Sequence, residues 1–152
     1  MNRNLTPLLS LCVGIMLAAL VVIPQLPRAS AQSAVGGDNM FHLIAANTNN
    51  STLIAAGEHT VHGVQLSGIG AAPGYLKLYD KVSAPTCGTD VPKKVLAIPA
   101  AATAANGAIN NVTISLGSQF QQGLGICVVT GIADNDNTAV AAATFNINID
   151  WK

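Results

Sequence analysis

The sequence predicts an all-β protein, a single antiparallel β-sandwich that is jelly-roll-like or immunoglobulin-like and is preceded by a signal peptide. Short apolar segments that alternate with polar residues recur along the chain, separated by Gly, Pro, Asn and Asp, which favour turns. The residues typical of helix surfaces are scarce, because Glu occurs once and Arg only near the N-terminus. Strands do not alternate with long helical patterns, which disfavours an α/β fold.

Residues 1–31 have the three parts of a secretory signal peptide. A positive start at Arg3 precedes a nearly continuous apolar run from Leu8 to Ile23, and Ala29-Ser30-Ala31 forms a small-residue cleavage site. An uncleaved membrane anchor is the alternative, because the apolar run approaches the roughly 20 residues that span a bilayer.

Cleavage would leave residues 32–39 as a flexible N-terminus and residues 40–152 as the sandwich domain. In this mature chain, five lysines stand against seven Asp and Glu residues, which gives a net charge of −2. No basic cluster is available to neutralise phosphates, so we expect no nucleic-acid partner. After cleavage we also expect no association with a membrane.

The strands follow from alternation and from turn residues. Ile126–Ile132 is apolar on both faces and is predicted to be a central strand, whereas Phe145–Trp151 alternates and should have one face on the core. Gly63 predicts a bulge or a close backbone approach. Ala100–Ala105 is predicted to be a loop or a single turn, because it is too short for a stable helix. In order, the strands are expected at Met40–Ala46, Ser51–Ala56, His59–Leu66, Tyr75–Val82, Val95–Ile98, Asn110–Leu116, Ile126–Ile132 and Phe145–Trp151.

The stretch Tyr75–Pro92 organises the prediction, because it begins as a regular strand and ends in a turn-rich segment. Alternation places Leu76, Leu78 and Val82 on the core face, and Tyr75, Lys77, Tyr79 and Lys81 on the opposite face. Tyrosine is enriched at interfaces, so we predict that these four outward residues form a contact surface for a protein partner or for self-association. The alternative is a solvated strand face on which tyrosine rings pack along lysine stems.

Two cysteines remain after Cys12 is removed with the signal peptide. In an exported protein, Cys87 and Cys127 are expected to form a disulfide, and closing the intervening loop of 127 − 87 = 40 residues would contribute on the order of 3–4 kcal/mol. The alternative is two independent buried thiols. Neither cysteine has a neighbouring histidine in the sequence, and no C-x-x-C motif occurs.

We predict no catalytic, cofactor-binding or metal-binding residues, and therefore no enzyme activity. The sequence has no G-x-S-x-G or H-E-x-x-H motif, and Glu58 is its sole glutamate. His59 and His62 are three residues apart on a predicted strand, so they should face opposite ways, and His42 lies far away in the sequence. We expect no small-molecule ligand.

Asp134, Asp136 and Thr138 alternate in a polar segment that faintly resembles a calcium-binding loop. An EF-hand would need a glutamate at its twelfth position, where Phe145 stands. A polar hairpin turn is the preferred interpretation, and calcium binding at residues 134–138 remains the alternative.

Three motifs in order resemble a known class of protein: YLKLYD, then APT-x-GTD-x-P, then ADNDNTAVAA. Over residues 47–152 the chain resembles small β-sandwich proteins of tailed bacteriophages, which are generally described as virion structural proteins. The resemblance implies a sandwich that works by packing, with no assigned catalytic residues. The export signal and the cysteine pair depart from it, because phage head and tail proteins assemble in the cytoplasm.

We therefore expect a non-enzymatic, exported β-sandwich that serves as a structural or binding module in the periplasm, at the cell surface or outside the cell. The alternative is a true phage virion protein, head-decorating or fibre-associated, that keeps its apolar N-terminal segment.

Overall fold

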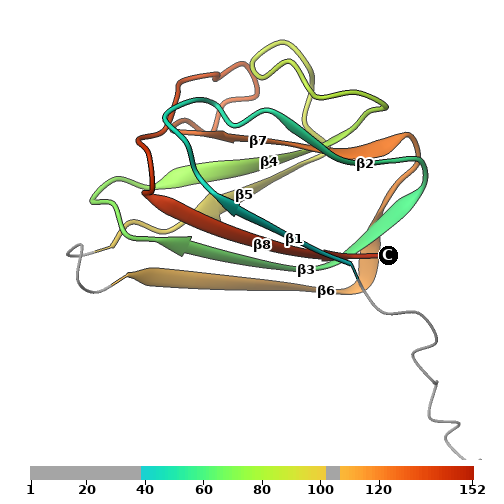
Figure 1. The fold of residues 1–152 in the computed structure, drawn as a ribbon, viewed down its shortest axis with the longest axis horizontal. Helices are drawn as coiled ribbons and strands as arrows, with labels where there is room; N and C mark the ends of the chain where they lie inside the picture. Colours follow the sequence, from blue (N-terminus) through green and yellow to red (C-terminus); the bar gives the residue numbers. More distant parts are fainter. Residues whose placement is uncertain (1–38, 102–106) are drawn as a thin grey trace, which may run out of the picture. The chain divides into compact units, whose positions relative to one another are not determined.

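The structure is a computed structural model that describes residues 39–101 and 107–152, without the side chains of residues 111–116. The predicted signal peptide, nearly all of the predicted flexible N-terminus and most of the Ala100–Ala105 segment lie outside the described residues. The described part folds into two four-stranded antiparallel sheets (Figure 1). The strands are β1 (Asn39–Ile44), β2 (Thr52–Ala56), β3 (His59–Gly68), β4 (Gly74–Asp80), β5 (Lys94–Ile98), β6 (Ala108–Phe120), β7 (Gly123–Val129) and β8 (Phe145–Trp151).

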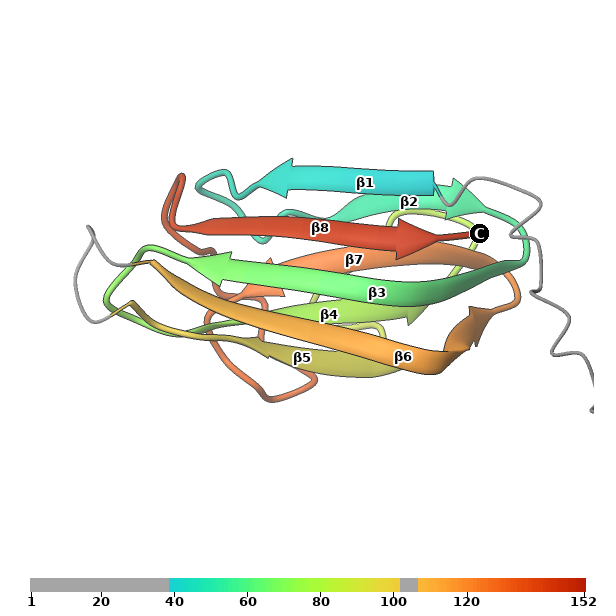
Figure 2. The ribbon, with the colours of Figure 1, turned by 90° about the horizontal axis from the view of Figure 1, so that it is seen from below.

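The strand order identifies the type of sandwich. One sheet has the order β1-β8-β3-β6 and the other has the order β2-β7-β4-β5. Every connection except β4–β5 crosses from one sheet to the other, so the two sheets face each other along their whole length (Figure 2). This eight-stranded order is that of a jelly roll, not of an immunoglobulin domain. The predicted all-β antiparallel sandwich is confirmed, and the order selects the first of the two predicted types.

The core lies between the two sheets, and it follows the alternation of the sequence. In β8, Phe145, Ile147 and Ile149 are buried, while Asn146 and Asp150 are exposed, as predicted for a strand with one face on the core. The fully buried aliphatic and aromatic side chains of this core are Val61, Leu66, Leu76, Leu78, Ile98, Phe120, Leu124, Ile126, Val128, Ile147 and Ile149.

β7 is buried along its whole length, which confirms the prediction of a central strand. It lies between β2 and β4, so both of its edges are hydrogen-bonded. Ile126 and Val128 point into the core, whereas Cys127 and Val129 belong to a second apolar cluster on the other face of the sheet. The strand ends at Val129, three residues before the predicted end at Ile132, which is exposed.

The bulge expected at Gly63 is present in β3. The register of β3 against both β6 and β8 shifts between Val61 and Gly63. A Cβ atom at Gly63 would lie 3.0 Å from the Asp150 carboxylate, so glycine allows β8 to approach closely. β6 continues past its predicted end at Leu116 to Phe120, which pairs with His59.

Candidate functional site

The outer face of β4 differs from the prediction. Tyr75, Lys77, Tyr79 and Lys81 do lie away from the main core, but Lys77 and Tyr79 have no exposed surface, and Tyr75 and Lys81 are half-buried. The expectation that the four residues form an exposed contact surface is therefore wrong for Lys77 and Tyr79. Val82 was expected on the core face, yet the strand ends at Asp80 and Val82 is 66% exposed.

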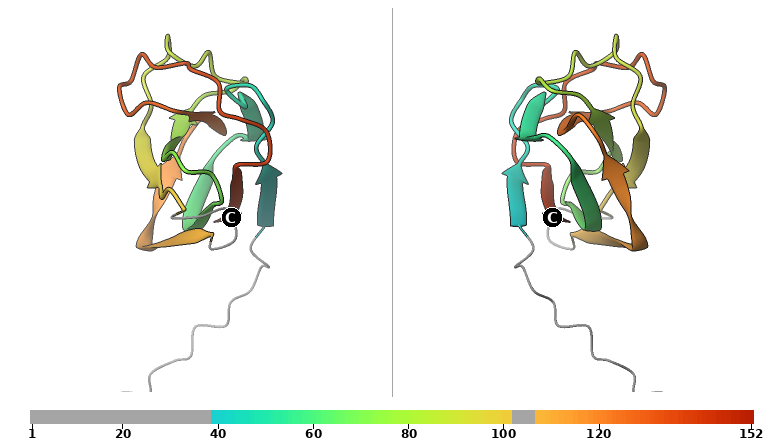
Figure 3. Two further views of the ribbon diagram at one scale, coloured as in Figure 1. Left: turned by 90° about the vertical axis from the view of Figure 1, so that its left-hand side faces the viewer. Right: turned by 90° about the vertical axis from the view of Figure 1, so that its right-hand side faces the viewer.

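Two long loops cause this burial by folding back over the sheet β2-β7-β4-β5. They are the β4–β5 loop, residues 81–93, and the β7–β8 loop, residues 130–144. Both lie on the same side of the sandwich, beyond that sheet (Figure 3). Beneath them, Tyr79, Cys87, Cys127 and Val129 form a second apolar cluster, with Tyr75 packed against it. Alternation identified the face of the strand, but it carries no information about loops that cover this face.

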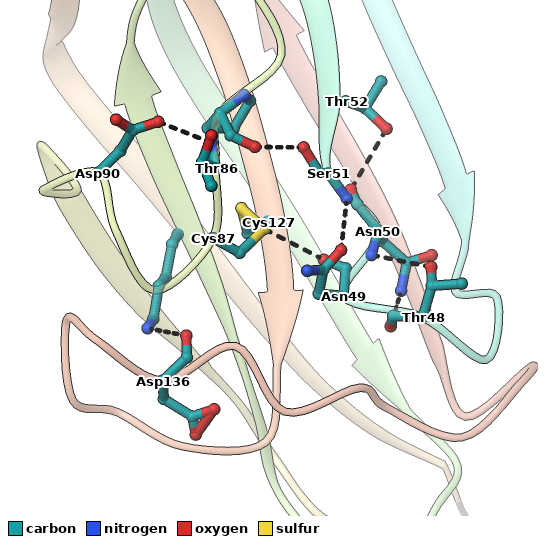
Figure 4. Close-up of a disulfide and its surroundings, with 12 residues drawn as sticks. Thr48, Asn49, Asn50, Ser51, Thr52, Thr86, Cys87, Asp90, Cys127 and Asp136 are labelled. Atoms are coloured by element: carbon teal, nitrogen blue, oxygen red, sulfur yellow. Dashed lines mark hydrogen bonds between the residues drawn. A yellow bond between two sulfur atoms is a disulfide. The ribbon is translucent and has the colours of Figure 1, made fainter.

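A disulfide attaches the β4–β5 loop to the sheet. Cys87 in the loop is bonded to Cys127 in β7, with an S–S distance of 2.01 Å and a Cα–Cα distance of 6.0 Å (Figure 4). Both cysteines are buried. The predicted pairing is thus present in the structure, and it joins the loop to the most deeply buried strand.

Polar contacts hold the rest of the β4–β5 loop. The Asp90 carboxylate accepts hydrogen bonds from the Lys81 ammonium at 2.5 Å and from the Thr86 backbone N–H at 2.6 Å. These two donors, the Lys81 ammonium first, lower the pKa of the Asp90 carboxyl. The Ser51 hydroxyl donates to the Pro85 carbonyl, which attaches the loop to the start of β2 (Figure 4).

A buried lysine holds the β7–β8 loop. The ammonium of Lys77 donates to the backbone carbonyls of Ala133 at 2.5 Å, Asp136 at 3.0 Å and Asp134 at 3.3 Å. Burial lowers the pKa of this ammonium, and the nearby Asp136 and Asp134 carboxylates partly oppose that shift. Two backbone oxygens of residues 134–138, those of Asp134 and Asp136, thus accept hydrogen bonds from the protein's own ammonium group.

The hydroxyl of Tyr79 is buried between the two loops. It has no hydrogen-bond partner within the described part of the chain. Burial raises the pKa of Tyr79 to about 12, and the Asp90 and Asp134 carboxylates add to the shift. Such a group has an unmet hydrogen bond in the folded state, which costs stability.

The three histidines lie in separate surroundings. His42 in β1 contacts the Asn148 side-chain oxygen at 2.7 Å, and His59 contacts the Ala56 carbonyl at 2.9 Å and packs edge-on against Trp151. His62 lies at the bulge of β3. In residues 39–101 and 107–152, no three His, Cys, Asp or Glu side chains lie close enough together to hold a metal ion.

Charge is concentrated at one end of the sandwich. This charged end carries the β2–β3 turn with Glu58, the ion pair between Asp80 and Lys93 at 2.9 Å, and Asp150. Asn39 pairs with Trp151 there, so both ends of the described chain lie at the charged end (Figure 1).

The opposite end is formed by four segments without a single Asp, Glu, Lys or Arg; we call it the uncharged loop end. Their described residues are 45–51, 69–73, 99–101, 107 and 139–144. Three exposed isoleucines surround it: Ile44, Ile69 and Ile109. An uncharged surface with exposed aliphatic side chains is typical of a protein contact rather than of a catalytic centre.

Two shallow apolar depressions lie at the uncharged loop end. The larger, about 360 Å³, lies between residues 70–73 and residues 140–145. The smaller, about 290 Å³, is lined by Ile44, Ile69 and Ala143. Phe145 lines both, and Gly74 makes room for it, because a Cβ atom there would lie 2.5 Å from the Phe145 ring. Sequence reasoning did not find this surface, although the absence of charge from all four segments was a visible signal.

No model of a known protein family matches the chain, and no curated protein matches it either. Within the two described ranges, no helix has the length and hydrophobicity needed to cross a membrane. The disulfide is compatible with an exported protein.

Proposed function

We propose that the protein is a non-enzymatic, exported β-sandwich module that packs its uncharged loop end against a partner protein. The observation that carries the proposal is the separation of charge: the segments that form one end lack charged residues and carry two apolar depressions, whereas the other end is charged. Loops at one end of a rigid sandwich are a common position for binding surfaces.

The position of the chain ends supports the same orientation. Asn39 and Lys152 lie at the charged end, as the pairing of Asn39 with Trp151 requires. Both ends of the described chain therefore lie opposite the uncharged loop end (Figure 1). The disulfide supports a role in an oxidising compartment, either the periplasm, the cell surface or the extracellular space.

A phage virion protein is the second candidate, and the strand order favours it. Jelly rolls recur in viral capsid domains, and the ordered motifs of the sequence resemble phage structural proteins. Similarity of fold and of motifs does not establish a function, so the choice between the two candidates depends on what the binding surface contacts.

Photo-crosslinking tests the proposed binding surface. A photoreactive amino acid is placed at Ala72, in the uncharged loop end, or at Glu58, in the charged end, and both variants are irradiated in the producing cells. We expect a protein crosslink from Ala72 and none from Glu58. Ile69→Asp should abolish that crosslink, whereas Val91→Asp, at an exposed position 78% accessible in the β4–β5 loop, should not. Equal crosslinking from both ends would contradict the proposal.

Intact mass separates the two candidates. A protein that begins at Gln32 and is two hydrogens lighter than its reduced form would support export. A full-length chain found in purified phage particles would support the virion candidate.

A further inference from the structure

We propose that the three carbonyls of the β7–β8 loop form a cation site that Lys77 fills from within, and that this site positions one wall of the larger depression. The ligand class is a primary ammonium group. The site itself does not depend on the proposed function, but its effect on partner binding does.

Three backbone carbonyls converge on the Lys77 ammonium. Three carbonyls from a four-residue stretch, those of Ala133, Asp134 and Asp136, point at one nitrogen atom, and Lys77 has no exposed surface. An ammonium group has three N–H donors, so each donor has one carbonyl partner. A buried charge is tolerated only when it is paired in this way.

The surroundings of the Lys77 nitrogen suit an ammonium group better than calcium. The nitrogen–oxygen distances of 3.0 and 3.3 Å to Asp136 and Asp134 suit N–H···O hydrogen bonds, and the distance of 2.5 Å to Ala133 is shorter than usual. Calcium takes oxygen ligands at about 2.3–2.6 Å and needs six to eight of them. The Asp136 carboxylate, which calcium would recruit, instead accepts the Thr138 backbone N–H at 2.7 Å. The three carbonyls match the three N–H donors of an ammonium group and are fewer than the oxygens that calcium needs.

The Lys77 site is continuous along the chain with the uncharged loop end. The loop that Lys77 holds continues into Val140, Ala141 and Thr144, which line the larger depression opposite residues 70–73. β4 supplies Lys77 from the rigid sheet, so the loop is positioned by a fixed strand. Lys77 is thus a positioning residue for the surface that the proposed function requires.

Removal and rescue test the site. Lys77→Ala removes three methylene groups and the ammonium, which propylammonium restores. The variant is then treated with a protease that cleaves on the N-terminal side of aspartate. Cleavage before Asp134 and Asp136 should be at least about tenfold faster in Lys77→Ala than in the native chain, which corresponds to a loss of roughly 1.4 kcal/mol of local stability. Propylammonium should restore resistance, while tetramethylammonium, which has no N–H donor, 1-propanol and calcium should not.

Two controls make the result specific. Lys94→Ala removes a lysine from the adjacent strand that contacts Ser118, so cleavage at residues 134 and 136 should stay at the native rate. Cleavage before Asp90 reports on the disulfide-bonded loop and should also stay unchanged. Native resistance in Lys77→Ala, or rescue by tetramethylammonium, 1-propanol or calcium, would overturn the proposal.

A measurement on the native chain covers the case in which Lys77→Ala does not fold. Acetylation with an amine-reactive ester should modify Lys93, which is partly exposed, and leave Lys77 unmodified at the same time point. Equal labelling of the two lysines would contradict the site.

Crosslinking from Ala72 in Lys77→Ala tests the link between the site and partner binding. A crosslink that is lost in the protease-sensitive variant and restored by propylammonium supports this link. An unchanged crosslink would show that the cation site does not position the binding wall.

Discussion

The two loops that cover the outer face of the sheet β2-β7-β4-β5 are held by different kinds of bond. The β4–β5 loop is bonded covalently to the sheet through Cys87 and Cys127. The β7–β8 loop is held by the hydrogen bonds that Lys77 donates to its carbonyls. The first attachment depends on redox conditions and the second on a buried charge. One face of a sheet can thus be covered by two loops whose attachments respond to different changes: one is released by reduction and the other by loss of a buried charge.

The largest expected effect is loss of the covalent attachment. Replacing Cys87 and Cys127 with alanine should lower the free energy of unfolding by about 3–4 kcal/mol, because the unfolded chain regains the freedom of a 40-residue loop. Urea unfolding of the oxidised native chain and of the double variant measures this difference. The β7–β8 loop should remain protected in the double variant, and its release would show that the two attachments are not independent.

Loss of the polar attachment should cost less. Lys77→Met keeps an unbranched side chain but leaves three carbonyls without their donor, which should lower the free energy of unfolding by about 2 kcal/mol. Hydrogen exchange of the Thr130 and Asp136 amides, which are bonded within this loop, reports the release directly. A loss as large as that of the cysteine variant would contradict the ranking.

Tyr79 lies between the two loops, and its replacement should stabilise the protein. Tyr79→Phe removes a buried hydroxyl without a described partner, so we expect a gain of about 1 kcal/mol at neutral pH. The folded pKa of Tyr79 is about 12 and the unfolded pKa is 10.0, so the folded state favours the neutral phenol. The titration of Tyr79 therefore leaves the free energy of unfolding unchanged below pH 10 and lowers it as pH rises towards 12. Denaturation of both proteins across this range should show a smaller alkaline loss for Tyr79→Phe, and parallel curves would refute the argument.

The smallest effect is expected at the base of the β4–β5 loop, where Asp80 pairs with Lys93. Burial opposes the shift, but the Gln122 backbone N–H and the Lys93 ammonium outweigh it and lower the pKa of Asp80 to about 2. The resulting stability is present above pH 3.8 and is lost as pH falls towards 2. Asp80→Asn should therefore reduce the loss of folding stability at acid pH. We expect the difference in the free energy of unfolding to be less than about 1 kcal/mol, because the ion pair is partly exposed. Acid titration followed by tryptophan fluorescence checks this expectation.

Much of the fold could be predicted because alternation is a local signal. The inward residues of β8, the central position of β7 and the bulge at Gly63 each followed from side-chain type and spacing over a few residues. The choice of a jelly roll needed the pairing of β1 with β8, which no local pattern specifies.

The covering loops could not be predicted in the same way. Lys77 and Tyr79 have the spacing of outward residues, and only contacts with residues more than 50 positions away, such as Ala133, reveal that Lys77 is buried. The predicted disulfide did indicate that Cys87 lies against the strand that contains Cys127, so the position of part of the β4–β5 loop could be predicted. A lysine placed between tyrosines on a strand can therefore be an internal donor instead of a surface residue.

The pairing of Asn39 with Trp151 has a consequence for engineering. Because the first and last strands are hydrogen-bonded neighbours, a short linker can join the chain ends and produce a circular permutant, opened at the two-residue turn between β6 and β7. Inserted into a loop of a host protein through these adjacent ends, the domain would present its uncharged loop end away from the host.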